Sequence, residues 1–173
     1  ECVLEAKSLA QKGHLVTFGI KAADPETGYG YIEANGGDVT SFKEKPDAQT
    51  ALEYVKSGKY FWNSGMFCFK AGVFLAELTK HSPEIFEACQ LASENISNTD
   101  TEIELTQQMM EKIPADSIDY AVMEKSDNVK VVPSFFHWSD LGSFDSLYEE
   151  LEKDQNQNTS ASNHYQVESK NNL

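Results

Sequence analysis

The stretch Tyr60–Gly72 reads YFWNSGMFCFKAG, two apolar arms on either side of the polar triplet Asn63-Ser64-Gly65. Aromatic and apolar runs of this length predict a β-strand, and a glycine inside a strand marks a bulge or a close approach of a ligand. We expect the arms to anchor the strand in a sheet. Asn63 can then present a donor and an acceptor to a pair of sugar hydroxyls, with Gly65 leaving room beside it. A plain β-bulge is the alternative.

Strands and helices alternate on both sides of this stretch. Before it, LVTFGI (15–20) predicts a buried strand, and residues 29–43 predict a hairpin that turns at Asn35-Gly36-Gly37-Asp38. A helix capped by Asp47 follows. After it, the pattern predicts helices at 71–81, 83–94, 105–110 and 116–125, a polar loop at 95–102, a strand at 129–134 and a final amphipathic helix. The alternation predicts an α/β protein with a mixed, mainly parallel sheet flanked by helices.

Charge and composition exclude several classes of partner. The 173 residues include 28 Asp and Glu against 14 basic residues, all of them Lys and none clustered. Because no basic stripe exists, nucleic acid is not an expected partner. No apolar run approaches the ~18 residues that cross a bilayer, so we expect no membrane contact. Three widely spaced cysteines without a C-x-x-C pair indicate reduced thiols and a cytoplasmic location.

The two ends of the sequence suggest a piece of a longer protein. ECVLEAKSLAQKG (1–13) reads as a helix entered without a capping residue, and 155–173 is rich in Asn, Ser and Gln. We therefore expect a domain fragment at 1–154, followed at 155–173 by a linker or the start of another domain. Half a sheet would leave an exposed edge, through which a homo-oligomer could form.

Five segments in sequence order carry a resemblance to a known family: ETGYGYI (26–32), FKEKPD (42–47), FWNSGMFCF (61–69), SIDYAVMEK (117–125) and WSDLGSFDSL (138–147). Together they resemble the sugar-nucleotide pyrophosphorylases, and within them the mannose-1-phosphate guanylyltransferases, which make GDP-mannose. The resemblance implies a Rossmann-like, glycosyltransferase-A-like nucleotidyltransferase domain. The family's glycine-rich loop with its Arg and Lys, which binds the nucleotide triphosphate, has no match here.

The missing loop implies that the chain is the second, sugar-phosphate-binding half of that domain. It also accounts for the absence of arginine, the usual clamp for phosphate. The isolated chain should then be essentially inactive. In the family a β-helical or cupin-like domain comes after the transferase domain, and residues 155–173 are compatible with its start.

The resemblance implies transfer of GMP from GTP to mannose-1-phosphate, with Mg²⁺ neutralising phosphate charge. Asp140, in the W-S-D-L-G segment, matches one of the family's two metal-binding aspartates and is expected to be catalytic as a ligand of Mg²⁺. Its alternatives are an N-cap of a helix starting near Gly142, or an exposed turn residue.

Substrate-binding roles are implied for Gly30, Glu44, Lys45, Asn63 and Gly65. Lys45 would hold the sugar phosphate as a point charge with a catalytic role, and Glu44 would accept hydrogen bonds from sugar hydroxyls. Gly30 would let the backbone approach the hexose; Glu26 and Thr27 could contribute to the same loop.

Other interpretations remain open at this stage. An exposed Glu-Lys pair is most often a solvated ion pair. We interpret SIDYAVMEK as mainly structural, although Asp119 and Glu124 could orient other groups. The rival functions are another hexose-1-phosphate nucleotidyltransferase and a non-catalytic paralogue that senses the sugar nucleotide.

Overall fold

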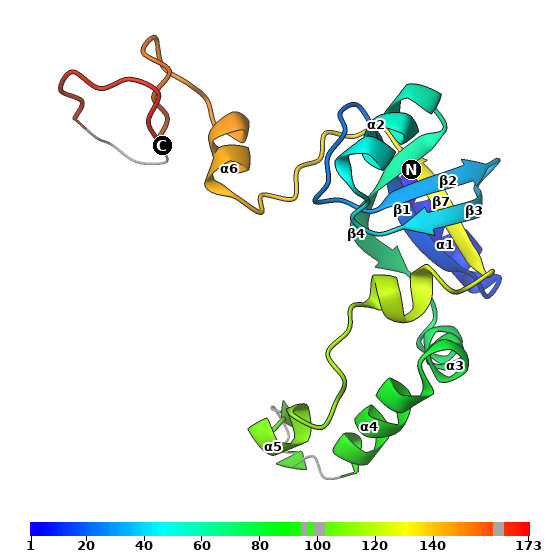
Figure 1. The fold of residues 1–173 in the computed structure, drawn as a ribbon. Coiled ribbons are helices and arrows are strands. Elements are labelled where there is room, and N and C mark those ends of the chain that lie inside the picture. The colour runs from blue at the N-terminus through cyan, green and yellow to red at the C-terminus, as the bar shows by residue number, and fades with distance from the viewer. Residues whose placement is uncertain (95–96, 99–102, 161–164) are drawn as a thin grey trace. The chain divides into compact units, whose positions relative to one another are not determined.

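The computed structural model describes residues 1–94, 97–98, 103–160 and 165–173, which form two compact units, Glu1–Phe135 and Phe136–Leu173 (Figure 1). Among the described residues, the first unit contains both sheets and every helix except α6 (Phe144–Glu150). The second contains the last helix and the polar C-terminal residues.

Five strands of the first unit close into a barrel. Their order around it is β1 (Leu15–Lys21), β4 (Tyr60–Cys68), β2 (Tyr31–Asn35), β3 (Asp38–Lys43) and β7 (Val129–Ser134). β1 and β7 pair in parallel, whereas the β1–β4, β2–β4, β2–β3 and β3–β7 pairs are antiparallel. The prediction of a mixed α/β protein is confirmed, but the prediction of a mainly parallel sheet is wrong for these residues.

Connection lengths explain this difference. β2 and β3 are joined by Gly36 and Gly37, which both have positive φ angles (60° and 91°), and a two-residue hairpin loop joins only antiparallel strands. β7 closes the barrel against β3 at one residue pair, Asp38 and Lys130, whose side chains also form an ion pair. Because this closure is a single residue pair, it shortens the open sheet edge that we expected but does not remove it.

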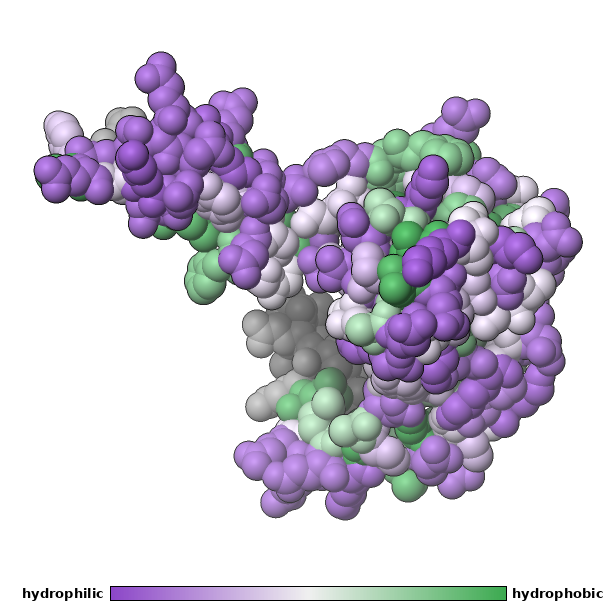
Figure 2. All heavy atoms as spheres, turned by 45° about the horizontal axis from the view of Figure 1, so that its top comes forward, coloured by the Kyte–Doolittle hydropathy of each residue, from purple (hydrophilic) through white to green (hydrophobic). Residues whose placement is uncertain are grey.

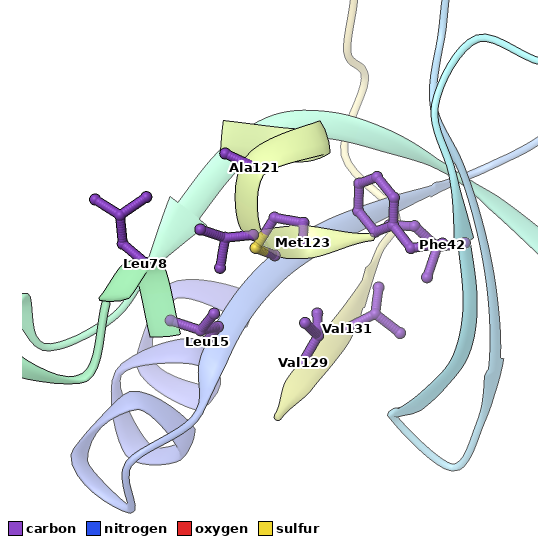
Figure 3. Close-up of a cluster of buried hydrophobic side chains, with 9 residues drawn as sticks. Leu15, Phe42, Leu78, Ala121, Met123, Val129 and Val131 are labelled. Atoms are coloured by element: carbon purple, nitrogen blue, oxygen red, sulfur yellow. The ribbon is translucent and has the colours of Figure 1, made fainter. Parts of the chain in front are cut away.

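A continuous apolar core fills the barrel and extends beneath the helices (Figure 3). Leu15 and Ile32 come from the strands and are fully buried. Leu78 contributes from α3 (Ala71–His81), and Val122 and Met123 contribute from η1 (Asp119–Met123). Packing of this kind fixes η1 relative to the strands, which is important for the site described below.

The helices follow the local sequence signals closely. The remaining ones are α1 (Cys2–Gln11), α2 (Ala48–Ser57), α4 (Pro83–Ser93), α5 (Gln107–Met110) and α6 (Phe144–Glu150). Asp47 caps α2 as predicted, since its Oδ1 accepts a hydrogen bond from the Thr50 N–H (3.0 Å). The helix predicted at 105–110 is shorter, because Thr106 is its N-cap.

Two other predicted segments differ in part. In the predicted loop 95–102, Ser97–Asn98 forms β5, which pairs with β6 (Ile103–Glu104); the rest of that loop lies outside the described residues. Within the helix predicted at 116–125, residues 119–123 form the π-helix η1 in place of an α-helix.

Hydrophilic residues cover most of the face shown in Figure 2, as the excess of carboxylates leads one to expect. Among the described residues, every helix is too short or too polar to cross a membrane. In the second unit Ser143 caps α6 with a capping box, and Asn158 binds several neighbouring chain segments by hydrogen bonds.

Candidate functional site

The polar triplet inside β4 forms a bulge beside Asn63. Thr17 of β1 lies opposite Phe67, whereas Gly19 lies opposite Asn63, so β4 holds additional residues between these two pairs. Gly65 lies in the bulge with a φ of 71°, a conformation that favours glycine. The β-bulge, which was the alternative interpretation of this stretch, is therefore present. It turns the chain just after Asn63.

The side chain of Asn63 is 8% exposed and is held from two sides. Its Oδ1 accepts a hydrogen bond from Thr17 Oγ1 (2.9 Å), and its Nδ2 donates to Asp119 Oδ1 (2.9 Å). A primary amide has two N–H groups. One of them can serve a ligand while the other holds Asp119, so the predicted role of Asn63 in binding a sugar stays a prediction that this geometry permits.

Glu44 follows the end of β3 and is buried, with 7% of its surface exposed. One carboxylate oxygen, Oε1, lies 3.3 Å from Lys45 Nζ, while the other, Oε2, is buried without a hydrogen-bond partner in the structure. A buried carboxylate oxygen without a partner is costly. Burial, together with the charge of Asp119 nearby, raises the pKa of Glu44, although the Lys45 ammonium opposes this effect.

Gly30 lies directly against this carboxylate. A Cβ at position 30 would lie only 2.3 Å from Glu44 Oε2 and 3.2 Å from Asn63 Cβ. The Asn63 N–H also donates to the Gly30 carbonyl (2.8 Å). The structure therefore brings together three of the predicted binding residues, Gly30, Glu44 and Asn63, from three different segments of the chain.

Lys45 is the fourth member of this group and is 58% exposed at its side chain. Its φ of 45° lies in the left-handed region, which costs a non-glycine residue about 1–2 kcal/mol. The strained backbone turns the chain immediately after the buried Glu44, so that one residue faces inward and the next reaches solvent. We refer to Gly30, Glu44, Lys45 and Asn63 as the platform.

Two further carboxylates contact the platform and were not assigned a binding role from the sequence. Asp119 accepts from Asn63, as described, and Glu124 Oε1 accepts from the Glu44 backbone N–H (2.6 Å). Lys43 Nζ lies 3.8 Å from the same oxygen. From the sequence, both could orient other groups, but their five-residue spacing puts them on different faces of an α-helix, so the pattern did not predict that both contact the platform.

Asp140 lies in the second unit, separate from the platform residues, which are all in the first. Its Oδ1 accepts a hydrogen bond from the Gly142 N–H (3.2 Å), and the N-cap of α6 is Ser143. The helix-capping alternative is therefore wrong, and the turn alternative describes its local structure. The role of Asp140 as a metal ligand stays a prediction.

The described residues supply at most part of a magnesium site. Among them, no three His, Cys, Asp or Glu side chains are grouped to hold a metal ion. Mg²⁺ usually takes one or two protein carboxylates and completes its shell with phosphate oxygens and water. The exposed carboxylate of Asp140 fits one such ligand.

A separate hollow of about 630 Å³ lies between α4 and α5 and is lined by residues such as Glu84, Leu91 and Met109. None of the platform residues lines it. The described buried polar atoms without a hydrogen bond belong to Glu44, Trp62 and His81, not to this hollow. We therefore place the candidate site at the platform, where a buried carboxylate oxygen of Glu44 lies against Gly30 without a hydrogen-bond partner among the described residues.

Known proteins resemble this chain over most of its length. A family model described as nucleotidyl transferase matches residues 1–157. The chain is 46% identical to the xanthan biosynthesis protein XanB of Xanthomonas campestris pv. campestris (strain B100), covering 98% of the chain and 37% of XanB. It is also 46% identical to the mannose-1-phosphate guanylyltransferase RfbM of Salmonella typhimurium, covering 91% of the chain and 34% of RfbM.

Two solved structures have the same fold over a large part of the chain. One is described as mannose-6-phosphate isomerase from Helicobacter pylori (TM-score 0.78, 44% identity, 80% of this chain and 56% of that one). The other is described as mannose-1-phosphate geranyltransferase from Thermus thermophilus (TM-score 0.73, 32% identity, 91% and 46%). The chain spans little more than a third of the curated relatives it matches.

Proposed function

We propose, from the premise that this chain belongs to the nucleotidyl transferase family, that it forms the hexose-phosphate-binding part of an enzyme that transfers GMP from GTP to mannose-1-phosphate. The products are GDP-mannose and pyrophosphate. The similarity to RfbM, a mannose-1-phosphate guanylyltransferase, supports the choice of substrates.

One observation carries the assignment of the site. Glu44 holds a buried carboxylate oxygen that has no hydrogen-bond partner among the described residues, at a position where the absent side chain of Gly30 makes room for that oxygen. Hydrogen bonds to charged groups contribute about 1.5–3 kcal/mol. A sugar hydroxyl donating to Glu44 Oε2 would satisfy this oxygen, and the adjacent Lys45 ammonium would lie beside the sugar's phosphate.

The proposed reaction assigns a role to each of these positions. An oxygen of the sugar 1-phosphate attacks the α-phosphorus of GTP, a new P–O bond forms, and the bond to pyrophosphate breaks. Lys45 neutralises the attacking phosphate and Glu44 orients the hexose, so that the reacting oxygen is held in line. Mg²⁺ would supply charge neutralisation on the triphosphate when bound, with Asp140 as one of its ligands.

Kinetics of the whole protein test this proposal. Pyrophosphate release from GTP should require mannose-1-phosphate and proceed more slowly with glucose-1-phosphate. Lys45→Ala should raise the KM for mannose-1-phosphate about tenfold or more, as expected for loss of one charge-assisted contact, with little change in the KM for GTP. Lys59→Ala, which removes another exposed lysine of the same unit, serves as the control.

Other results would favour the alternatives. Faster turnover with another hexose-1-phosphate would reassign the sugar. Binding of GDP-mannose without any pyrophosphate release would favour a sensor of the sugar nucleotide. Equal effects of Lys45→Ala on both substrates would remove Lys45 from the sugar-phosphate site.

A further inference from the structure

The π-helix η1 places two carboxylates on the same side. The Glu124 N–H donates to the Asp119 carbonyl (2.9 Å), a bond across five residues. In an α-helix, residues five apart lie about 140° apart around the axis. The wider π turn aligns them, because its hydrogen bonds join residues i and i+5. Asp119 and Glu124 therefore share a face, which an ordinary helix of the same sequence would not allow.

Each of these carboxylates holds a different part of the platform. Asp119 Oδ1 accepts from Asn63 Nδ2 at 2.9 Å, which fixes the amide against its other partner, Thr17. Glu124 Oε1 accepts from the Glu44 backbone N–H at 2.6 Å. Asn63 lies on β4 and Glu44 follows β3, and these strands are not neighbours in the barrel. One short helix thus connects two strands that share no hydrogen bonds.

The opposite side of η1 is fixed to the rest of the unit. Ala121, Val122 and Met123 are buried in the core. The buried Ser82, which precedes α4, donates through its hydroxyl to the Ala121 carbonyl (2.9 Å), and Lys125 Nζ donates to Ser82 Oγ (3.3 Å). These contacts prevent η1 from moving independently of α3 and α4.

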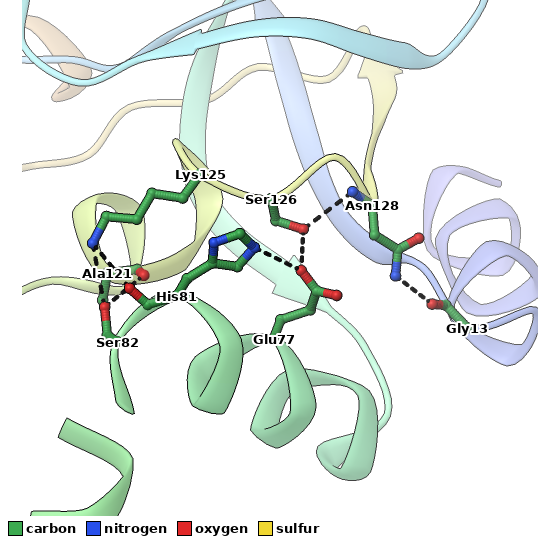
Figure 4. A network of polar contacts seen from close by, with 8 residues as sticks. All are labelled: Gly13, Glu77, His81, Ser82, Ala121, Lys125, Ser126 and Asn128. Carbon is green, nitrogen blue, oxygen red and sulfur yellow. Dashed lines mark hydrogen bonds and ion pairs between the residues drawn. The ribbon is translucent and has the colours of Figure 1, made fainter. Parts of the chain in front are cut away.

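The segment after η1 is held in the same way (Figure 4). Ser126 donates to Glu77 Oε2 of α3 (2.5 Å) and accepts from the Asn128 backbone N–H (3.1 Å). Asn128 Nδ2 donates to the Gly13 carbonyl (2.8 Å). His81 lies at ion-pair distance from Glu77 (3.2 Å), although its Nε2 lacks hydrogen-bond geometry.

We propose that η1 is a positioning element for the hexose-phosphate site: its π turn brings Asp119 and Glu124 to one face, where they set the Asn63 amide and the Glu44 backbone relative to each other. Asp119 and Glu124 are positioning residues, since each acts through a platform residue. The inference deepens the proposed function and rests on it for its effect on turnover. The effect on the platform's hydrogen bonds is independent of any substrate.

The geometry explains why such an element is needed. Binding and catalytic groups must be held to about 0.5 Å by neighbours that are themselves fixed. Glu44 is followed by the strained backbone of Lys45, and its side chain faces the negative charge of Asp119. Without the Glu124 contact, the Glu44 backbone would be free to relax this strain and carry its carboxylate away from Gly30.

Backbone amide exchange in the whole protein tests the inference directly. Glu124→Leu keeps the side-chain size but removes the acceptor, and should speed exchange of the Glu44 amide about tenfold or more. Glu124→Gln keeps an acceptor oxygen and should restore most of the protection. Glu53→Gln, on the exposed face of α2, should leave the Glu44 amide at the parental rate. Exchange in β1 and β7 reports global stability.

Kinetics provide the second readout. Glu124→Leu and Asp119→Leu should raise the KM for mannose-1-phosphate about tenfold while the KM for GTP stays within about twofold, and Asp119→Asn should recover part of the loss. Parental exchange at Glu44 in Glu124→Leu, or equal acceleration in β1 and β7, overturns the inference. So does an equal rise in both KM values.

If Glu124→Leu fails to fold, the parent protein still decides the question. The Glu44 amide proton should resonate downfield with a small temperature coefficient, because a carboxylate at 2.6 Å polarises it; an ordinary chemical shift and temperature coefficient refute the contact. If the parent shows this contact but turns over no hexose phosphate, the proposed function fails while the positioning geometry stands.

Discussion

Replacing Gly30 by alanine places a methyl group where the Glu44 carboxylate lies. The new Cβ would be 2.3 Å from Glu44 Oε2, about 1 Å less than the 3.4 Å at which ordinary contact begins, and 3.2 Å from Asn63 Cβ. The φ angle of Gly30 is not positive, so alanine can adopt the same backbone conformation. The strain comes from the contact between its methyl group and the Glu44 carboxylate. Overpacking of this kind costs about 1–3 kcal/mol. We expect a loss of stability in that range as Glu44 is pushed aside.

The matched control lies two residues earlier in the same loop. Gly28 has no atom within 4 Å of an added Cβ, so Gly28→Ala should change stability by no more than about 0.5 kcal/mol. Denaturant unfolding of both variants gives the difference, and steady-state kinetics should show a raised KM for mannose-1-phosphate in Gly30→Ala alone. Equal unfolding free energies for the two variants would refute the assignment of Gly30 as the residue that makes room for Glu44.

Three further predictions concern the platform and the core. The pKa of Glu44 is raised above its ordinary 4.5, so the folded chain holds this proton more tightly than the unfolded chain does. The free energy of unfolding therefore falls as pH rises from 4.5 through the folded pKa. Glu44→Gln should raise the thermal unfolding temperature at neutral pH, and an equal gain below pH 4.5 would contradict this. Lys45→Gly and Lys45→Ala remove the same ammonium, but the glycine variant should have the larger free energy of unfolding, by about 1 kcal/mol, because glycine adopts the left-handed backbone without strain. Chemical denaturation measures this difference, and equal stability of the two variants would mean that the backbone relaxes. Ile32→Ala, at a fully buried barrel position, should cost about 2–5 kcal/mol in the same assay, and a cost below about 1 kcal/mol would argue against a packed barrel.

Local signals in the sequence predict most of the elements and one feature of the site. The Asp47 cap, the Gly36-Gly37 hairpin and the interruption of the strand at Asn63 each depend on a few adjacent residues. Such features can be predicted from short sequence patterns, because the hydrogen bonds and backbone conformations that form them involve neighbouring residues. The resemblance to a family then named five substrate-binding residues, and the structure brings four of them together as the platform.

Features that depend on distant contacts could not be predicted in this way. Strand direction in the sheet depends on which strands meet, and β7 meets β1 across most of the chain. The π turn differs from an α-helix by one hydrogen-bond step, which the SIDYAVMEK pattern does not encode. The burial of Glu44 follows from Gly30, Asn63 and Asp119 packed around it, whereas a Glu-Lys pair alone suggests a solvated surface.

The parallel pairing of β1 with β7 has a consequence for how the chain is made. His14 and Asn128, which join the two strands at the start of this pairing, are 114 positions apart. At a synthesis rate of about 5–20 residues per second, roughly 6–23 s pass between them. In the later part of that interval β1, the β2–β3 hairpin and β4 have been made, while β1 still lacks its partner on one side. An unpaired strand edge is a template for pairing with other chains, so the nascent chain is most prone to aggregation, and has most to gain from a chaperone, until β7 emerges.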